Sequence, residues 1–229
     1  MKFPGKVLVI GCGAVSQCAL PLILKLIGVH PKQVTVMDPI DNRARVKDVL
    51  DQGVQYVFEK VVEDNYKQLL ANNVGSGDLI IDLAYDIDCC AILQWCHDQN
   101  VLYINTSVEL WHPYLGAEGK HPTELTLYAR HMAMRKVIAG WKNKKGATTV
   151  MDHGANPGLV SHFTKQALIG IAEKILKEKP QDPRKKQLEA YLKDQNFPKL
   201  AQTTGVKTIH ISERDTQITS KPKEVNEFV

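Results

Sequence analysis

A glycine turn near the start of the chain is the first feature whose residue types and spacing could do chemistry. It follows the apolar run 6–10 and precedes a second apolar stretch, 14–27. A buried strand, a glycine turn and a helix N-terminus, in that order, build an anion site, because free N–H groups and the positive end of the helix dipole face the anion. We take the turn residues as candidates for binding a dinucleotide pyrophosphate: Gly11, Gly13, Ala14, Val15 and Ser16.

The turn departs from the usual dinucleotide pattern at one position. Ser16 stands where the third glycine of G-x-G-x-x-G would allow tight packing of the helix on the strand, and serine is small enough to serve. Two glycines are also consistent with nothing more than a tight turn. The motif therefore needs an acidic partner at the next strand.

That partner is Asp38, which ends the predicted strand 33–38. It lies 25 positions after Gly13, near the spacing at which a carboxylate accepts hydrogen bonds from adenosine ribose hydroxyls. The carboxylate would repel a 2′-phosphate, which favours NAD over NADP, while Arg43 and Arg45 keep NADP open as the lesser option. By itself the acid is equally consistent with a helix cap. With all the parts in register, we predict dinucleotide binding.

The elements that must position these residues alternate between strand and helix. Strands joined by helices through short turns indicate a doubly wound parallel α/β sheet, a Rossmann-like domain that we assign to residues 1–152. Periodicity predicts strands at 6–10, 33–38, 54–58, 78–83, 101–105 and 148–151, and helices at 14–27, 43–52, 63–71, 86–99 and 123–141.

The remainder, 153–229, is expected to begin a second, α+β substrate domain. A helix at 159–177, a connector at 179–184 and a strand at 205–213 are predicted there. The strand needs partners that this part barely supplies, and residues 224–229 end on apolar side chains with no stop signal. We therefore expect this domain to be incomplete.

Composition narrows the classes of protein. The chain has 229 residues, 44% hydrophobic and 24% charged, as in ordinary soluble proteins, and its net charge of +4 argues little for nucleic acid. No apolar run approaches the roughly 20 residues of a membrane span, and no signal peptide precedes the first strand. The five cysteines have no zinc-binding spacing. We expect a cytoplasmic protein without a metal, a membrane partner or a nucleic acid partner.

Carboxylates and amides gather where the strands end. Ligands of open α/β sheets bind beyond the carboxyl ends of the strands, and acids there attract a cationic substrate such as an amine. Each acid alone is better explained as a cap or a solvated loop residue. The polar residues at these ends are Asp38, Asp82, Asp86, Asn105, Glu109, Asp152 and Asn156.

Two stretches stand out among these ends. Residues 105–109 hold several polar groups and one acid near where a nicotinamide would reach. In 152–159, Pro157 and Gly158 could fix a turn that holds the Asn156 amide towards the cleft. A plain turn followed by a helix start explains the second stretch equally well.

Four segments closely resemble the bacterial homospermidine synthases, relatives of the saccharopine dehydrogenases. The stretches ANPGLVSHF and HISERDTQ are specific, whereas the glycine turn is shared by many oxidoreductases. Members of that family are longer and continue through a substrate domain. The four segments are GCGAVSQCALPL, YINTSVE, DHGANPGLVSHF and TGVKTIHISERDTQ.

The resemblance implies a redox-neutral amine transfer with NAD as a recycled cofactor, in which putrescine, alone or with spermidine, gives homospermidine. It also implies a homodimer. By match to the family, Glu109, Asn156 and Glu213 surround the amine, with Asp86 a weaker addition. The glycine turn, Asp38, Asp82, Ala84 and Thr106 are expected to touch the cofactor.

Two alternatives remain. An NAD(P)-dependent dehydrogenase of the saccharopine or carboxynorspermidine kind makes a carboxylated amine and should need arginines in the cleft. Between the fourth strand and Pro157 the only arginines are Arg130 and Arg135, both on a predicted helix, which disfavours it. A domain that binds NAD and reports on it, without catalysis, is the non-enzyme alternative.

Overall fold

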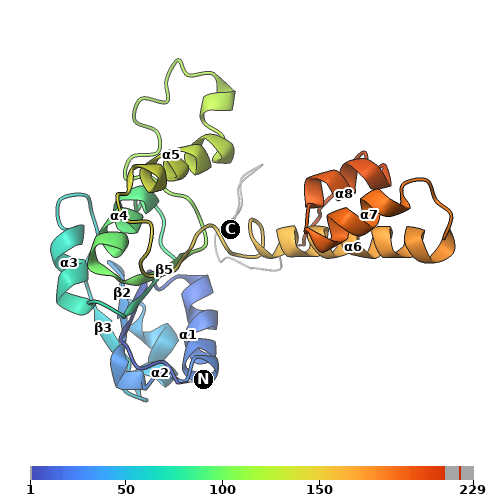
Figure 1. The fold of residues 1–229 in the computed structure, drawn as a ribbon. Helices are drawn as coiled ribbons and strands as arrows, with labels where there is room; N and C mark the ends of the chain where they lie inside the picture. The colour runs from blue at the N-terminus through green and yellow to red at the C-terminus, as the bar shows by residue number, and fades with distance from the viewer. Residues whose placement is uncertain (1, 215–221, 223–229) are drawn as a thin grey trace. The chain divides into compact units, whose positions relative to one another are not determined.

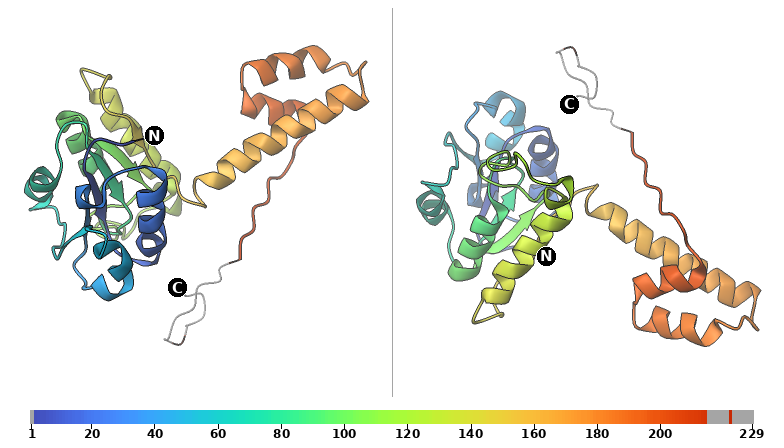
Figure 2. Two further views of the ribbon diagram at one scale, coloured as in Figure 1. Left: turned by 90° about the horizontal axis from the view of Figure 1, so that it is seen from below. Right: turned by 90° about the horizontal axis from the view of Figure 1, so that it is seen from above.

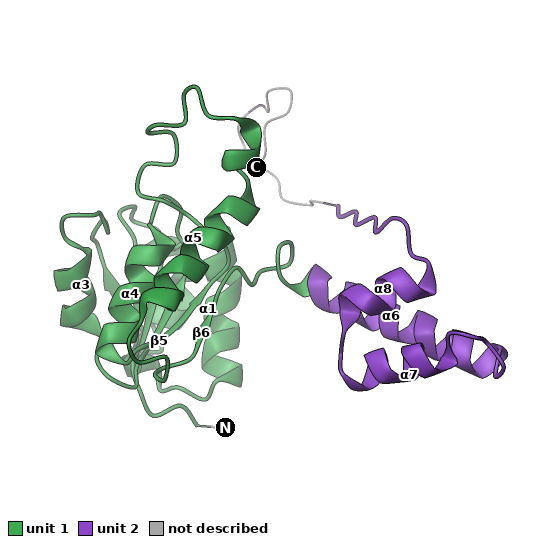
Figure 3. Cartoon of the chain, turned by 45° about the horizontal axis from the view of Figure 1, so that its top comes forward, with its two compact units in different colours: residues 1–159 green, residues 160–229 purple. Residues whose placement is uncertain are grey.

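The computed structural model describes residues 2–214 and 222. It divides into two compact units, residues 1–159 and 160–229, shown in different colours in Figure 3. Each unit is described by itself below. None of the helices in the described part of the chain is long and apolar enough to cross a membrane.

Six parallel strands form the sheet of the first unit, in the order β3-β2-β1-β4-β5-β6. Val9 of the central strand lies opposite Val36 on one side and Ile81 on the other. This order, which reverses between β1 and β4, confirms the predicted doubly wound sheet. The strands are β1 (Val7–Ile10), β2 (Val34–Met37), β3 (Gln55–Val57), β4 (Leu79–Asp82), β5 (Leu102–Asn105) and β6 (Thr149–Val150).

Helices cover both faces of this sheet (Figures 1 and 2). All five follow successive strands, and their predicted positions are confirmed apart from shifts of a few residues at their ends. The helices of the first unit are α1 (Ala14–Leu26), α2 (Lys47–Leu50), α3 (Tyr66–Asn73), α4 (Cys89–Gln99) and α5 (Leu127–Gly140), with short 3-10 turns at Pro31–Gln33, Arg43–Val46 and Pro122–Glu124.

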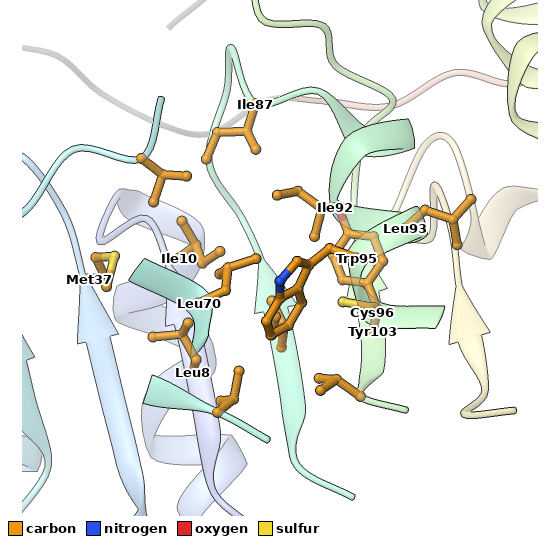
Figure 4. Packing of buried hydrophobic residues seen from close by; sticks show 14 residues of the cluster. Leu8, Ile10, Met37, Leu70, Ile87, Ile92, Leu93, Trp95, Cys96 and Tyr103 are labelled. Atoms are coloured by element: carbon orange, nitrogen blue, oxygen red, sulfur yellow. The ribbon is translucent and has the colours of Figure 1, made fainter. Parts of the chain in front are cut away.

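The first unit has two hydrophobic cores, one on each face of the sheet, and β1 contributes side chains to both. Val7 and Val9 point to the face covered by α1 and α2, where Leu20 of α1 is fully buried. Leu8 and Ile10 point to the opposite face, where the side chains of α3 and α4 pack on the sheet (Figure 4). A strand buried on both faces reads as a continuous apolar run, which is why the sequence predicts it so clearly.

The described part of the second unit consists of three helices. They are α6 (Leu159–Glu178), which starts at the boundary between the units, α7 (Lys185–Lys193) and α8 (Phe197–Thr204). Ala172, Leu188 and Leu200, one from each helix, are fully buried against one another. In Figure 2, α7 and α8 lie along the C-terminal half of α6.

The predicted strand at 205–213 is wrong. Gly205 ends α8 with a positive φ of 84°, and residues 206–214 are in neither helix nor strand. An alternating sequence gives a strand one polar and one apolar face, but a strand also needs a neighbouring strand to pair with its backbone. The pattern does not show whether such a neighbour exists. Residues 224–229, on which the expectation of an incomplete domain depended, lie outside the described residues. The predicted division after residue 152 stays a prediction.

Candidate dinucleotide and amine site

The glycine turn directly follows β1. Gly11 has a φ of 92°, and a Cβ there would lie 3.1 Å from the backbone of Leu83 and Ala84, so the turn packs closely on the segment after β4. A Cβ on Gly13 would meet nothing within 4 Å. The space above Gly13 is therefore open, at the start of α1 where the sequence predicts a dinucleotide pyrophosphate.

The start of α1 is free to bind an anion. Gly13 is its N-cap and has no side chain to cap the first turn, and Ala14 and Val15 are exposed beside it. Ser16 is fully buried, and its hydroxyl donates to the carbonyl oxygen of Gly11 at 2.5 Å. The serine thus ties the turn to the helix at the position where the usual pattern has its third glycine.

Asp38 lies directly after β2 and is almost completely buried. Its Oδ2 accepts a hydrogen bond from the backbone N–H of Cys12 at 2.5 Å, and its Oδ1 accepts from the N–H of Ile40 at 2.7 Å. The carboxylate therefore links the glycine turn to the loop after β2. Burial, with a further contribution from the charge of Asp38, raises the pKa of the Cys12 thiol, which keeps this thiol protonated and unreactive.

A cavity of about 320 Å³ opens at the carboxyl ends of β1 to β4. Its volume is within the range of small-ligand sites. It lies where the strand order reverses, which is the usual ligand position in such sheets. Five of the predicted residues line it: Gly11, Gly13, Asp38, Ala84 and Asp86. The other lining residues are Ile10, Met37, Pro39, Ile40, Asn42, Glu59, Lys60, Val61, Leu83, Tyr85 and Ile87.

Tyr56 of β3 holds two of the lining residues, Ile40 and Asn42, although it does not line the cavity itself. Its hydroxyl donates to the carbonyl oxygen of Ile40 at 2.5 Å and accepts from the N–H of Asn42 at 3.3 Å. It therefore fixes the loop after β2, which lines the cavity beside Asp38. The strand pattern predicts an alternating Tyr56, but no spacing signal identifies its partners in advance.

Asp82, at the end of β4, is held inside the protein. Its Oδ2 accepts from the Tyr103 hydroxyl at 2.9 Å, and its Oδ1 accepts from the N–H of Ala84 at 3.2 Å. Burial, more than the nearby charge of Glu109, raises the pKa of this carboxyl to about 6. Asp82 thus shapes the turn that carries Ala84, while its predicted contact with the cofactor stays a prediction.

Tyr103 connects Asp82 to the neighbouring strand end. Its hydroxyl also accepts from Nδ2 of Asn105 at 3.2 Å, and burial, followed by the charge of Asp82, raises the pKa of Tyr103 well above its usual value. Figure 4 shows its ring in the core beside α4. Asn105 was recognised in the sequence only as a polar strand end. The fully buried Tyr103 gave no sign of a polar role.

The two stretches singled out in the sequence lie together. A Cβ on Gly154 would be 3.6 Å from Cβ of Thr106, so the segment after β6 runs against the segment after β5. The carbonyl oxygen of Glu109 accepts from the N–H of Cys89 at 3.2 Å, and that of Val108 accepts from Nη1 of Arg130 at 2.6 Å. The predicted amine-side residue Glu109 is therefore on a loop held by both α4 and α5.

The turn that carries Asn156 is closed tightly on itself. The N–H of Gly154 donates to the carbonyl oxygen of Pro157 at 2.8 Å. Gly158 has a φ of 125°, and a Cβ there would lie 2.4 Å from the carbonyl oxygen of Gly154, so only glycine fits. Asn156 itself is exposed at the tip of the turn.

Two other predicted amine-side residues belong to other segments of the chain. Asp86 is exposed with a φ of 56° and lines the 320 Å³ cavity. Glu213 belongs to the second unit and is exposed in the segment after α8. Within the residues described, no group of three or more His, Cys, Asp or Glu side chains is arranged to hold a metal ion.

An open glycine turn, an acid at the end of β2 and a cavity at the reversal of the strand order define a dinucleotide-binding domain of the doubly wound class. Residues 7–151 match the family described as the saccharopine dehydrogenase NADP binding domain. The chain belongs to this family.

Longer relatives are similar along nearly the whole chain. A homospermidine synthase from Mesorhizobium japonicum is 37% identical over 99% of this chain, and one from Blastochloris viridis is 32% identical over 100% of it. The matches cover 45% and 46% of those proteins, so the chain spans less than half of their length. A crystal structure of the homospermidine synthase from Legionella pneumophila in complex with NAD is 28% identical, with a TM-score of 0.71, over 98% of this chain and 43% of that one.

Proposed function

We propose that this chain provides the NAD-binding part of a homospermidine synthase. The observation that carries the proposal is the similarity to such synthases, which extends through 99% or more of the chain and therefore beyond the cofactor domain. The cavity at the carboxyl ends of β1 to β4 supports it, because Gly13 lines this cavity and no atom lies within 4 Å of a Cβ placed on Gly13, which leaves room beside the turn.

The adenosine side of the cavity favours NAD over NADP. Asp38 places a nearly buried carboxylate there, and Glu59 lines the same cavity. Arg43, which could otherwise bind a 2′-phosphate, donates from Nε and Nη2 to both oxygens of Asp41, at 2.9 and 2.7 Å. Its charge is thus already paired, and this pairing holds the pKa of Asp41 down at about 2.

The proposed reaction uses NAD without consuming it. One putrescine is oxidised to an imine, water replaces ammonia to give an aldehyde, and a second diamine condenses on the aldehyde with loss of water. Reduction of the new imine gives homospermidine, so that two putrescine molecules yield one homospermidine and one ammonia. The bound cofactor accepts a hydride in the first half and returns it in the second. Spermidine can replace the first putrescine as the aminobutyl donor, and 1,3-diaminopropane then leaves in place of ammonia.

The protein's part in this reaction is to hold dications and to take up protons. An alkylammonium group must lose a proton before hydride can leave the adjacent carbon. We assign Glu109 and Asn156 of the first unit, and Glu213 of the second, to the amine, with Asp86 as the weaker candidate. Carboxylates suit this role because they attract the ammonium groups and accept their protons.

A dehydrogenase that makes a carboxylated amine is less well supported. Its substrate carboxylates would need cationic partners. Between β4 and Pro157 the chain has two arginines, Arg130 and Arg135. Arg130 already donates from Nη1 to the carbonyl oxygen of Val108. This stretch therefore offers few arginines to bind substrate carboxylates.

The test uses the protein made from its complete reading frame. It is incubated with putrescine and a trace of NAD⁺, and the products are measured by mass spectrometry. Homospermidine and ammonia in large excess over NAD⁺ are expected. Accumulation of NADH without homospermidine would show a simple dehydrogenase, and NAD binding with no change in the amine would show a sensor. We also propose that the protein is a cytoplasmic homodimer. Light scattering measures its mass in solution and so tests the dimer.

A further inference from the structure

The turn that carries Asn156 is anchored at its first residue. The Asp152 side chain is only 4% exposed, and its Oδ2 lies 2.7 Å from Nε2 of His131 in α5. Its Oδ1 is buried and has no hydrogen-bond partner among the described residues. A buried carboxylate is costly unless it is hydrogen-bonded. His131 therefore supplies the side-chain hydrogen bond that keeps Asp152 in place.

The backbone of this anchor is also held. The N–H of Asp152 donates to Oδ1 of Asn105 at 2.7 Å, and the N–H of His153 donates to the Asn105 carbonyl oxygen at 3.0 Å. Asp152 has a φ of 58°, a left-handed conformation that costs free energy for a residue with a side chain. Such a conformation persists because the surrounding contacts impose it.

The residue before His131 makes the equivalent contact with the other loop. Nη1 of Arg130 donates to the carbonyl oxygen of Val108 at 2.6 Å, next to Glu109. Two consecutive residues of α5 thus hold the segments that carry two of the three predicted amine-side residues of the first unit. Arg130 holds the segment with Glu109, and His131 holds the turn with Asn156.

We infer that Arg130 and His131 are positioning residues, which set the loops after β5 and β6 in the arrangement that binds the diamine. The inference rests on the proposed function, because that function assigns the amine to Glu109 and Asn156. Neither residue is required to touch the substrate or the cofactor. The cofactor cavity is lined by other segments, so the two effects can be separated by experiment.

The first measurement is hydrogen–deuterium exchange over residues 152–158 in the full-length protein. His131→Phe keeps a ring but removes the donor, and faster exchange in the turn is expected. His131→Gln restores an N–H donor at a similar reach, and exchange near the wild-type rate is expected. Lys136→Ala, an exposed position on the same helix, is the matched control and should change nothing in the turn. His131→Ala replaces the Phe variant if that variant does not fold.

The second measurement separates substrate from cofactor in the same variants. His131→Phe should raise KM for putrescine by about tenfold, the size expected for losing one hydrogen bond to a charged group, while the Kd for NAD stays within about twofold. Arg130→Ala should likewise raise KM for putrescine, with exchange rising over 106–109, and Arg130→Lys should recover part of the loss. Because Thr106 in this segment is expected to touch the cofactor, KM for putrescine is compared with Kd for NAD in the His131 variants alone.

The inference is overturned if exchange in the turn is unchanged in His131→Phe, or if His131→Gln is as impaired as His131→Phe. It is also overturned if KM for putrescine and Kd for NAD rise together in His131→Phe. Wild-type protein that makes no homospermidine would refute the proposed function instead. The exchange measurement would still decide whether His131 holds the turn.

Discussion

Asp38 and Cys12 are joined by a 2.5 Å hydrogen bond from the backbone N–H of Cys12 to the Asp38 carboxylate. The residue predicted to bind the ribose is therefore also the residue that fixes the middle of the glycine turn. The second oxygen of Asp38 holds the N–H of Ile40. One buried side chain thus holds both the turn predicted to bind the pyrophosphate and the loop after β2, and we expect changes at Asp38 to act on both.

We expect Asp38→Asn to weaken NAD binding by about tenfold, because it removes charge from hydrogen bonds to the backbone and the ribose. The loss should be smaller for NADP, since repulsion of the 2′-phosphate is removed as well. Titration calorimetry with both cofactors measures the two effects. Asp48→Asn, at an exposed position of α2, is the control. An unchanged ratio of NAD to NADP affinity would contradict the proposed preference.

Gly11 and Gly13 should respond in opposite ways to alanine. Gly11 combines a φ of 92° with backbone atoms 3.1 Å from a new Cβ, so Gly11→Ala should lower the free energy of unfolding by about 1 to 3 kcal/mol. Gly13 has a φ of −76° and open space around it. Gly13→Ala should therefore keep its Tm but lose at least about tenfold in NAD affinity. Thermal unfolding and NAD titration of both variants test the contrast, and a large drop in Tm for Gly13→Ala would refute it.

Tyr56→Phe should loosen the loop that lines the adenosine side. The change removes the hydroxyl that bridges Ile40 and Asn42, and a loss of about three- to tenfold in NAD affinity is expected from one or two neutral hydrogen bonds. Tyr114→Phe, at a position 88% exposed, provides a control with the same chemical change. Equal affinities in the two variants would show that the bridge has no influence on the cofactor site.

Asp82 makes stability depend on pH. Its pKa is raised by burial from 3.8 to about 6 in the folded state, so the folded protein binds a proton more tightly than the unfolded chain does. This contribution is complete below about pH 4 and is lost as the pH rises through about 6, up to about 3 kcal/mol in all. Asp82→Asn should flatten this part of the pH profile.

Urea unfolding at a series of pH values from 4 to 7 measures the Asp82 contribution. Asp98→Asn, at an exposed position of α4, should leave the shape of the profile unchanged. If the free energy of unfolding depends on pH in the same way in the wild-type protein and in Asp82→Asn, the raised pKa of Asp82 is ruled out.

The first unit could be predicted well because its signals are local. The runs Val7–Ile10 and Leu79–Asp82 are buried on both faces and are bounded by turns, so composition alone reveals them. The glycine turn and Asp38 follow from a spacing that the chemistry of dinucleotide binding requires. The fold class and most of the cofactor cavity are therefore accessible from the sequence.

What escaped prediction depends on contacts between distant segments. The roles of Tyr56, Tyr103 and His131 come from partners 14 to 21 positions away, brought close by the sheet. The alternation at 205–213 looked like a strand, but pairing needs a neighbour that periodicity cannot show. Helices α7 and α8 were missed because their few apolar residues matter only when three helices meet.

The hydrogen bond from Ser16 to Gly11 has a consequence for how such domains diversify. A side chain that satisfies a carbonyl of its own turn makes the third glycine of the fingerprint dispensable, provided that the replacement stays small. This position requires a small side chain that can hydrogen-bond within the turn, and it does not require glycine itself. Searches that demand three glycines will pass over domains of this kind, whereas the acid at the end of β2 remains a usable marker.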